Sequence, residues 1–257
     1  MLRAALTIAG SDPSGGAGIQ ADLKTFHRFG VYGEAAITLV TVQNTERVSH
    51  VELMPPVLVA QQVEAVIGDI PPRAAKTGAL GSADIVEAVA SLARSFRFPL
   101  VVDPVMISKH GARLLNDRAA EALKTVLLPL AALVTPNVPE AEALAGIEIA
   151  SEEQMKAAAV RILEGGCEAV LVKGGHLAGD PVDILHTRDG VEIFRYPRIA
   201  SRHTHGTGCT YSAAITAGLA LGRPLAEAVR SAREYLQEAI RTAPGLGRGS
   251  GPVNHFA

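Results

Sequence analysis

The strongest constraint on this fold is a regular alternation of short apolar runs with segments of helical periodicity. Strands are predicted at residues 4–9, 34–42, 48–53, 74–76, 99–103, 131–134, 169–172, 184–186 and 192–196. Helices are predicted at about 19–29, 58–67, 84–94, 117–127, 152–164, 210–221 and 225–242. This alternation is typical of a mostly parallel sheet with helices on both faces. With no internal repeat or linker, we predict one α/β domain over residues 1–257.

Composition limits the classes of partner. The 257 residues include 24 basic and 26 acidic side chains, a net charge of −2, which gives no electrostatic footprint for nucleic acid or an anionic membrane. Two cysteines are too few for a disulfide framework. The N-terminus lacks the pattern of a signal peptide, and the longest apolar stretch, 126–134, is too short to span a membrane. We expect a cytoplasmic protein without nucleic-acid or membrane partners.

A glycine-rich loop, residues 10–18, follows the first strand and precedes a helix. Gly16-x-Gly18-x-x-Ala21 is a variant of the dinucleotide fingerprint, and a helix N-terminus favours anions. The acid expected about 20 residues later is poorly matched by Glu34 and Glu46. No lysine of the Walker type follows. Phosphate binding and a tight strand-to-helix turn both stay open for this loop.

A second glycine-rich segment, His205-Gly206-Thr207-Gly208-Cys209-Thr210, precedes an apolar helix. Gly206, Thr207 and Gly208 expose backbone amides that, with the helix dipole, would bind a transferring phosphoryl group. The dipole is expected to lower the pKa of the Cys209 thiol, whose thiolate would accept a proton from an attacking hydroxyl. The alternative is a buried helix start with an inert cysteine.

Polar residues also follow several other strands. Asp103 ends one strand, and Asn137-Val138-Pro139-Glu140 begins a helix after the next one. The carboxylates of Asp103 and Glu140 would suit Mg²⁺ beside phosphates. The alternatives are a surface turn for Asp103 and a helix cap for Asn137.

Three further polar residues are candidates for ligand contacts. Lys173, at a strand end next to glycines, suits phosphate. The Gln43 carboxamide could read an aminopyrimidine edge, and Asp22 is a candidate together with it. A solvated turn and a polar strand end are the alternatives. His203 and His205 have no cysteine partners at zinc-finger spacing, so a structural zinc site is not expected.

Taken together, these segments resemble the hydroxymethylpyrimidine and phosphomethylpyrimidine kinases of thiamine biosynthesis, in the ribokinase-like superfamily. The resemblance runs from Leu6 to Phe256. The segments that carry it, in matching order and spacing, are 9–24, 42–45, Thr135-Pro136-Asn137-Val138-Pro139-Glu140, 173–176, 204–210 and 251–256. It implies a three-layer sandwich with a small β lid, and a homodimer.

The resemblance also implies roles for individual residues. Gly206, Thr207 and Gly208 would form the anion hole, with Cys209 as the base. Three further groups of residues would contact the ligands. The aminopyrimidine would be held by Asp22, Gln43, Gly10 and Val105. The Mg²⁺ would be held by Asp103, Asn137 and Glu140, and the nucleotide by Lys173 with Asn137 and Thr135. Such enzymes use ATP and usually phosphorylate first the alcohol and then its monophosphate.

One position departs from the family pattern. The family commonly has Gly-Met-Leu where this chain has Gly78-Ala79-Leu80. The methionine packs on the substrate ring, so Ala79 predicts a roomier pocket that tolerates pyridoxine-like alcohols. The sequence leaves three other functions open: a pyridoxal or pyridoxine kinase, a dinucleotide-dependent oxidoreductase, and a catalytically silent pyrimidine-binding protein.

Overall fold

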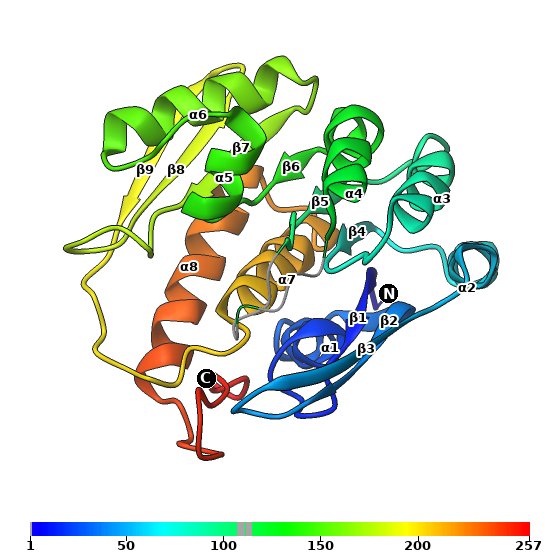
Figure 1. Ribbon diagram of the computed structural model, residues 1–257, viewed down its shortest axis with the longest axis horizontal. Coiled ribbons are helices and arrows are strands. Elements are labelled where there is room, and N and C mark those ends of the chain that lie inside the picture. The colour runs from blue at the N-terminus through cyan, green and yellow to red at the C-terminus, as the bar shows by residue number, and fades with distance from the viewer. Residues whose placement is uncertain (1, 107–110, 112–114) are drawn as a thin grey trace.

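A nine-stranded sheet forms the centre of the computed structural model, which describes residues 2–106, 111 and 115–257 (Figure 1). The strands are β1 (Ala4–Ser11), β2 (Tyr32–Gln43), β3 (Val48–Leu53), β4 (Ala74–Thr77), β5 (Leu100–Val102), β6 (Leu133–Val134), β7 (Ala169–Lys173), β8 (Val182–Thr187) and β9 (Gly190–Arg195). Their order is β3-β2-β1-β4-β5-β6-β7-β8-β9. The strands from β2 to β7 pair in parallel, whereas β3, β8 and β9 join antiparallel at the two edges.

Helices cover both faces of this sheet. They are α1 (Gly18–Arg28), α2 (Pro56–Asp69), α3 (Ala83–Ala93), α4 (Asp117–Ala122), α5 (Val138–Ala145), α6 (Glu152–Glu164), α7 (Thr207–Ala220) and α8 (Leu225–Arg241). Helices α2 to α6 share one hydrophobic core with the sheet, and α1, α7 and α8 pack on the opposite face. The predicted three-layer α/β sandwich of the ribokinase-like class is therefore confirmed.

The central strands show why the chain forms these layers. Val102 and Val134 belong to the core under α2 to α6, whereas their neighbours Val101 and Leu133 pack against α7 and α8. Successive side chains of a strand point to opposite faces, so a continuous apolar run buries both faces at once.

Strand β2 belongs to two parts of the structure. Its first half pairs with β1 in the main sheet, and residues 39–43 pair with β3 in an antiparallel ribbon. The strands predicted at 34–42 and 48–53 are thus present and form the small β extension expected of the lid.

One predicted helix differs from the structure. The segment 117–127 is α-helical only over α4 and continues as a π-helical turn, Leu123–Leu127, and a short 3₁₀ turn, Leu128–Leu130. The 3₁₀ turn contains Pro129, which lacks the N–H that a continuing α-helix needs. In the described ranges, no helix has the length and apolar character needed to cross a membrane.

A buried ion pair joins α8 to the sheet. The Arg233 Nε atom lies 3.0 Å from Asp183 Oδ2, and both side chains are about 5% exposed or less. The other carboxylate oxygen of Asp183 accepts a hydrogen bond from the Gly174 amide at 3.0 Å. Removing the cation would leave a buried carboxylate with one partner fewer.

We therefore expect Arg233→Met to lower the free energy of unfolding by about 3–5 kcal/mol, because the charge of Asp183 stays buried. Arg118→Met is the matched control, since Arg118 pairs with Asp84 on the exposed surface. We expect Arg118→Met to lower the free energy of unfolding by no more than about 1 kcal/mol. Urea denaturation of both variants measures the difference, and equal losses would contradict the expectation.

Candidate active site

The carboxyl ends of the parallel strands open into a cavity of about 460 Å³. This is the edge at which open α/β sheets bind ligands. Most of the predicted site residues meet on its walls: Gly10, Gln43, Ala79, Asp103, Val105, Asn137, Glu140, Lys173, Gly206, Thr207, Gly208 and Cys209. Segments that lie far apart in the sequence therefore share one site.

Asp22 and Thr135 do not line the cavity, because both are fully buried behind it. The Asp22 Oδ2 atom lies 2.8 Å from Lys76 Nζ and accepts a 2.6 Å hydrogen bond from Thr7. Thr135 donates to Asp103 Oδ1 at 3.0 Å. In the structure these two residues support the cavity wall.

The start of α7 forms a cradle of backbone amides. Gly206 precedes the helix with a φ of 80°, and a Cβ there would lie 1.7 Å from the Gly16 carbonyl oxygen. Only glycine fits this close approach. No described side chain caps the helix. By helix geometry the amides of Gly208 and Cys209 have no acceptor within α7, so they and the helix dipole favour an anion.

The predicted lowering of the Cys209 pKa is wrong. Burial raises the pKa of this thiol to about 12, and the carboxylates of Asp22 and Asp103 add to the effect. The charge of Lys76 acts in the opposite direction but is outweighed. Desolvation disfavours a thiolate more than the helix start favours it. Burial therefore favours the neutral form of the Cys209 thiol, although this residue is partly exposed on the cavity wall.

Asp103 lies at the centre of a charged cluster. Its Oδ1 atom is 2.9 Å from Lys173 Nζ, and its Oδ2 accepts a 3.3 Å hydrogen bond from Ser212 on α7. Although burial opposes ionisation, the charges of Lys173 and Lys76 hold the pKa of Asp103 below its usual value. The cluster therefore places a fixed carboxylate and a partly exposed ammonium group on the cavity floor.

Asn137 and Glu140 form a capping box at the start of α5. Asn137 Oδ1 accepts from the Glu140 amide at 2.9 Å, and Glu140 Oε2 accepts from the Asn137 amide at 2.8 Å. Burial raises the pKa of Glu140 to about 7, against the opposing charge of Lys173. The helix-cap alternative for Asn137 is thus correct in geometry, while both residues also reach the cavity wall.

The carboxylates of Asp103 and Glu140 fit Mg²⁺ in their chemistry, since oxygen is the ligand that this ion prefers. Both already have protein partners. Within the described part of the chain, no three His, Cys, Asp or Glu side chains are grouped as metal ligands. The residues therefore suit an ion that keeps several waters and binds mainly to substrate phosphates, which is usual for Mg²⁺.

Strand β2 forms the wall opposite the start of α7, because its successive side chains point alternately into and away from the cavity. Leu39, Thr41 and Gln43 line the cavity, whereas Val40 and Val42 point outward and are exposed. Gln43 thus projects into the cavity from the ribbon that β2 forms with β3.

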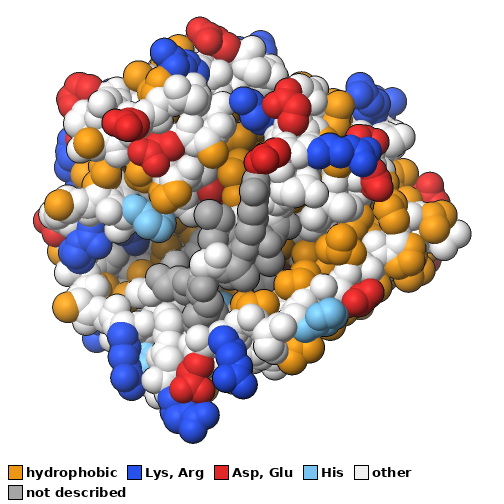
Figure 2. Space-filling view, viewed as in Figure 1, with side chains coloured by type: hydrophobic (Ala, Val, Ile, Leu, Met, Phe, Trp, Pro, Cys, Tyr) orange, Lys and Arg blue, Asp and Glu red, His pale blue; other side chains and the backbone are white. Residues whose placement is uncertain are grey.

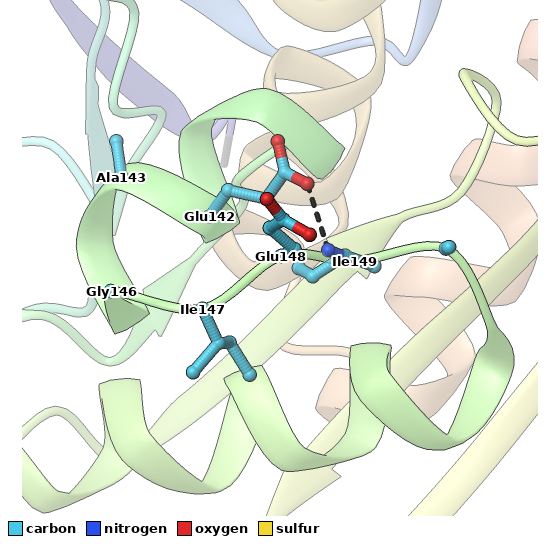
Figure 3. Close-up of a pocket in the computed structure, with 7 residues that line it drawn as sticks. Glu142, Ala143, Gly146, Ile147, Glu148 and Ile149 are labelled. Carbon is cyan, nitrogen blue, oxygen red and sulfur yellow. Dashed lines mark hydrogen bonds between the residues drawn. The ribbon is translucent and has the colours of Figure 1, made fainter.

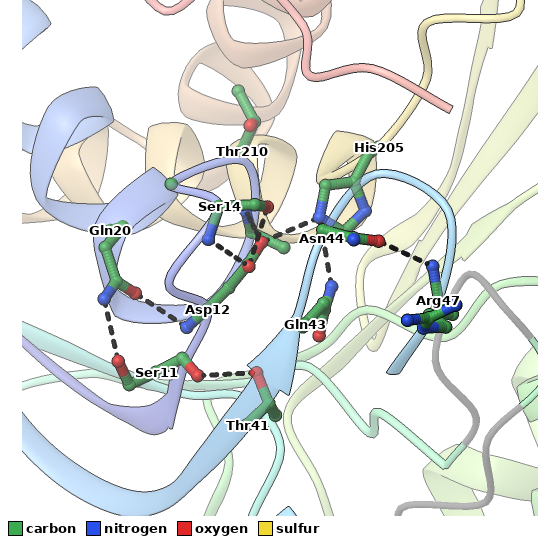
Figure 4. Close-up of polar contacts among 12 residues, drawn as sticks. Ser11, Asp12, Ser14, Gln20, Thr41, Gln43, Asn44, Arg47, His205 and Thr210 are labelled. Atoms are coloured by element: carbon green, nitrogen blue, oxygen red, sulfur yellow. Dashed lines mark hydrogen bonds and ion pairs between the residues drawn. The ribbon is translucent and has the colours of Figure 1, made fainter. Parts of the chain in front are cut away.

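Sequence analysis missed a polar pair beside Gln43 (Figure 4). His205 Nε2 lies 2.7 Å from Asp12 Oδ2 and 3.3 Å from Gln43 Nε2. Asp12 also accepts hydrogen bonds from Ser14 and from the Ala17 amide. The sequence offered one signal, an aspartate followed by small residues, which is typical of a side chain that bonds its own loop.

A second hollow lies between the end of α5 and the start of α6 (Figure 3). It is shallow, and Glu142 and Glu148 are its charged residues. Glu142 Oε1 accepts from the Ile149 amide at 2.8 Å, so this carboxylate holds the connecting loop. Among the predicted site residues, none lines this hollow.

Comparison with known proteins agrees with this geometry. The family described as phosphomethylpyrimidine kinase matches residues 12–254. A hydroxymethylpyrimidine/phosphomethylpyrimidine kinase of Staphylococcus aureus is 47% identical, over 98% of this chain and 93% of the relative. The thiamine biosynthesis bifunctional protein ThiED of Geobacter sulfurreducens is 52% identical over 98% of this chain, which spans only 52% of that longer protein.

A solved structure shares the whole architecture. Pyridoxal kinase of Bacillus subtilis, in an ADP complex, superposes with a TM-score of 0.92 at 37% identity, covering 100% of this chain and 98% of that one. Both the sequence match and the shared fold cover the cavity-lining segments. The chain belongs to the phosphomethylpyrimidine kinase family.

Proposed function

We propose that this protein transfers the γ-phosphoryl group of ATP to the hydroxymethyl group of 4-amino-5-hydroxymethyl-2-methylpyrimidine, and then to the monophosphate, to give the diphosphate used in thiamine biosynthesis. The observation that carries the proposal is the single cavity in which the amide cradle of α7 faces Gln43 across the strand ends. The names of the relatives support the substrate.

Phosphoryl transfer depends mainly on positioning and on stabilising charge. The amides of Gly208 and Cys209 would bind the oxygens of the transferring group, and Lys173 would neutralise phosphate charge from the cavity floor. Lys173, Asn137 and, through Asp103, Thr135 would form the nucleotide side of the site. Gln43, Gly10, Val105 and Ala79 would surround the pyrimidine, with Asp22 acting from behind through Lys76.

Asp103 and Glu140 would hold Mg²⁺ through water, and a bound Mg²⁺ would supply neutralisation of the phosphate charge. Cys209 would take the hydroxyl proton as a thiolate. Because burial raises the pKa of its thiol, the S–H proton first has to leave for water or for a phosphate oxygen of the bound nucleotide. We place the transfer late in the reaction, when the oxygen already bonds to phosphorus and its proton is acidic.

A pyridoxal kinase is the second candidate, favoured by the TM-score of 0.92 with a protein of that name and by the small side chain of Ala79. The oxidoreductase alternative has less support, because the 10–18 loop packs on the α7 cradle at Gly16 and Gly206. A silent binding protein would not need Asp103, Glu140 and Cys209 together on one wall.

We further propose a cytoplasmic homodimer that pairs through the outer face of the β2–β3 ribbon. Exposed apolar side chains gather there and at the start of α2 (Figure 2). They are Val40 and Val42 on the ribbon and Val57 and Leu58 at the start of α2. The β3 edge adds unpaired backbone groups, which in natural proteins are usually covered or paired. Two free cysteines suit a reducing compartment.

The activity is tested with ATP, Mg²⁺ and either the pyrimidine alcohol or its monophosphate, with ADP release and product mass as readouts. We expect turnover of both, and turnover of neither would reject the proposed function. Cys209→Ala should lower kcat by at least about 10²-fold, because a general base is lost. Nucleotide affinity, measured by calorimetry, should persist, and wild-type turnover in this variant would reject the base assignment.

Ala79→Met should narrow the pocket and favour the pyrimidine over pyridoxine. A few methylene groups in an apolar pocket change selectivity by about 10-fold or more. The measurement is the ratio of kcat/KM for the two alcohols in the native protein and the variant. If this ratio is the same in both proteins, Ala79 is not the reason that the pocket accepts pyridoxine.

Val42→Asp should convert the dimer to a monomer, because it places a charge in the apolar interface. Val191→Asp is the matched control: Val191 is also an exposed valine, but it lies on β9 at the opposite edge of the sheet. Light scattering after size-exclusion chromatography gives the mass of each. A monomeric native protein, or a dimeric Val42→Asp variant, would refute the interface.

A further inference from the structure

We infer that His205, held by Asp12, is a positioning residue that fixes which end of the Gln43 carboxamide faces the cavity, and so selects rings by the order of their hydrogen-bond donors and acceptors. The inference deepens the proposed function and rests on it, because it concerns how the pyrimidine edge is read. It follows from three side chains that come from the 10–18 loop, from β2 and from the segment before α7 (Figure 4).

The first step is the proton on His205. Its Nε2 lies 2.7 Å from Asp12 Oδ2, and both side chains are at most 4% exposed. Burial raises the pKa of Asp12, but hydrogen bonds from His205 and Ser14 outweigh it and hold that pKa below the usual value. An ionised carboxylate oxygen is an acceptor only, so the proton of this short contact belongs to His205 Nε2.

The second step concerns the atom of Gln43 that faces this proton. The structure places Gln43 Nε2 3.3 Å from the same Nε2, so in this arrangement two nitrogen atoms face each other. Two N–H groups cannot bond each other, and the two ends of a carboxamide have the same shape, so hydrogen bonding decides between them. The favourable arrangement exchanges the two ends of the carboxamide and turns the carbonyl oxygen of Gln43 toward His205, whose single Nε2 proton it then shares with Asp12 Oδ2 in a three-centre bond. Its –NH₂ group then points into the cavity as a donor.

The third step is the consequence for a ligand. The oriented amide offers a donor, and beside it the remaining lone pair of its oxygen. This order matches a ring nitrogen acceptor next to an amino group, as in a 4-aminopyrimidine. A 4-oxopyrimidine presents the reverse order, an N–H beside a carbonyl oxygen. An amide held in one orientation would therefore bind the amino ring and reject the oxo ring.

His205 also directly precedes Gly206, the first residue of the cradle. A Cβ on Gly16 would lie 2.5 Å from the His205 ring, so the imidazole packs closely on the glycine-rich loop. If His205 had a purely structural role, its loss would loosen the cradle and slow phosphorylation of both ring substrates alike. If His205 orients Gln43, its loss would change the ratio of the Kd values for the two rings, which distinguishes the two roles.

The test uses 4-amino-5-hydroxymethyl-2-methylpyrimidine and its 4-oxo counterpart. Calorimetry gives Kd for both rings, and kcat and KM are measured wherever turnover occurs. The native protein should prefer the amino ring. In His205→Leu and His205→Asn the preference in Kd should fall by about 10-fold, because neither side chain presents a donor at the Nε2 position and the amide is free to turn over.

His205→Gln should restore most of the preference, because the amide nitrogen of glutamine can occupy the Nε2 position and donate to both partners. His203→Leu is the matched control, a histidine two positions earlier that does not line the cavity. It should leave the preference unchanged. Thermal melting identifies which variants fold, and two different loss variants keep the comparison available if one of them does not.

Normal turnover with a preference that survives both loss variants would overturn the inference and leave the proposed function intact. The inference is also overturned if the loss variants slow turnover of both ring substrates equally, or if His205→Gln fails to restore the preference. A native protein that turns over neither ring would defeat the proposed function, and equal Kd values for both rings in that protein would defeat the inference as well.

Discussion

The close contact between the 10–18 loop and the start of α7 is the constraint on which the site depends. It brings the Gly16 carbonyl so near residue 206 that a Cβ would lie 1.7 Å away. The contact of His205 with Asp12, at 2.7 Å, joins the same two segments through side chains. Because β1 and α7 are both packed in the core, this contact sets the distance between the amide cradle and the opposite wall at Gln43.

Buried charge is the second determinant of the site. Two lysines, Lys76 and Lys173, are each paired with an aspartate beneath or beside the cradle. Unpaired burial of these groups would be costly, and the opposite charge beside each lysine offsets part of that cost. Burial and these carboxylates raise the pKa of the Cys209 thiol, which favours its neutral form. The amides at the start of α7, by contrast, favour an anion.

Much of the architecture was predictable from local patterns. The strands at 48–53 and the helix at 152–164 agree with the structure residue for residue, because period-2 and period-3.6 apolar patterns are local signals. The helix expected at 117–127 was less well predicted, since it continues as a π-helical turn that contacts α3 and that the apolar pattern does not indicate. Most predicted site residues meet at one cavity because strand ends converge at one edge of a parallel sheet.

The sequence by itself determined the sandwich, the strand-end location of the site and the glycines that the cradle requires. The tertiary structure alone decided the protonation of Cys209, the burial of Asp22 and Thr135 behind the wall, and the pairing of Asp12 with His205, 193 positions apart. The physical reason is that periodicity and backbone conformation depend on near neighbours in the chain. Ionisation and hydrogen-bond direction depend on neighbours in space, which only the assembled sheet and helices bring together.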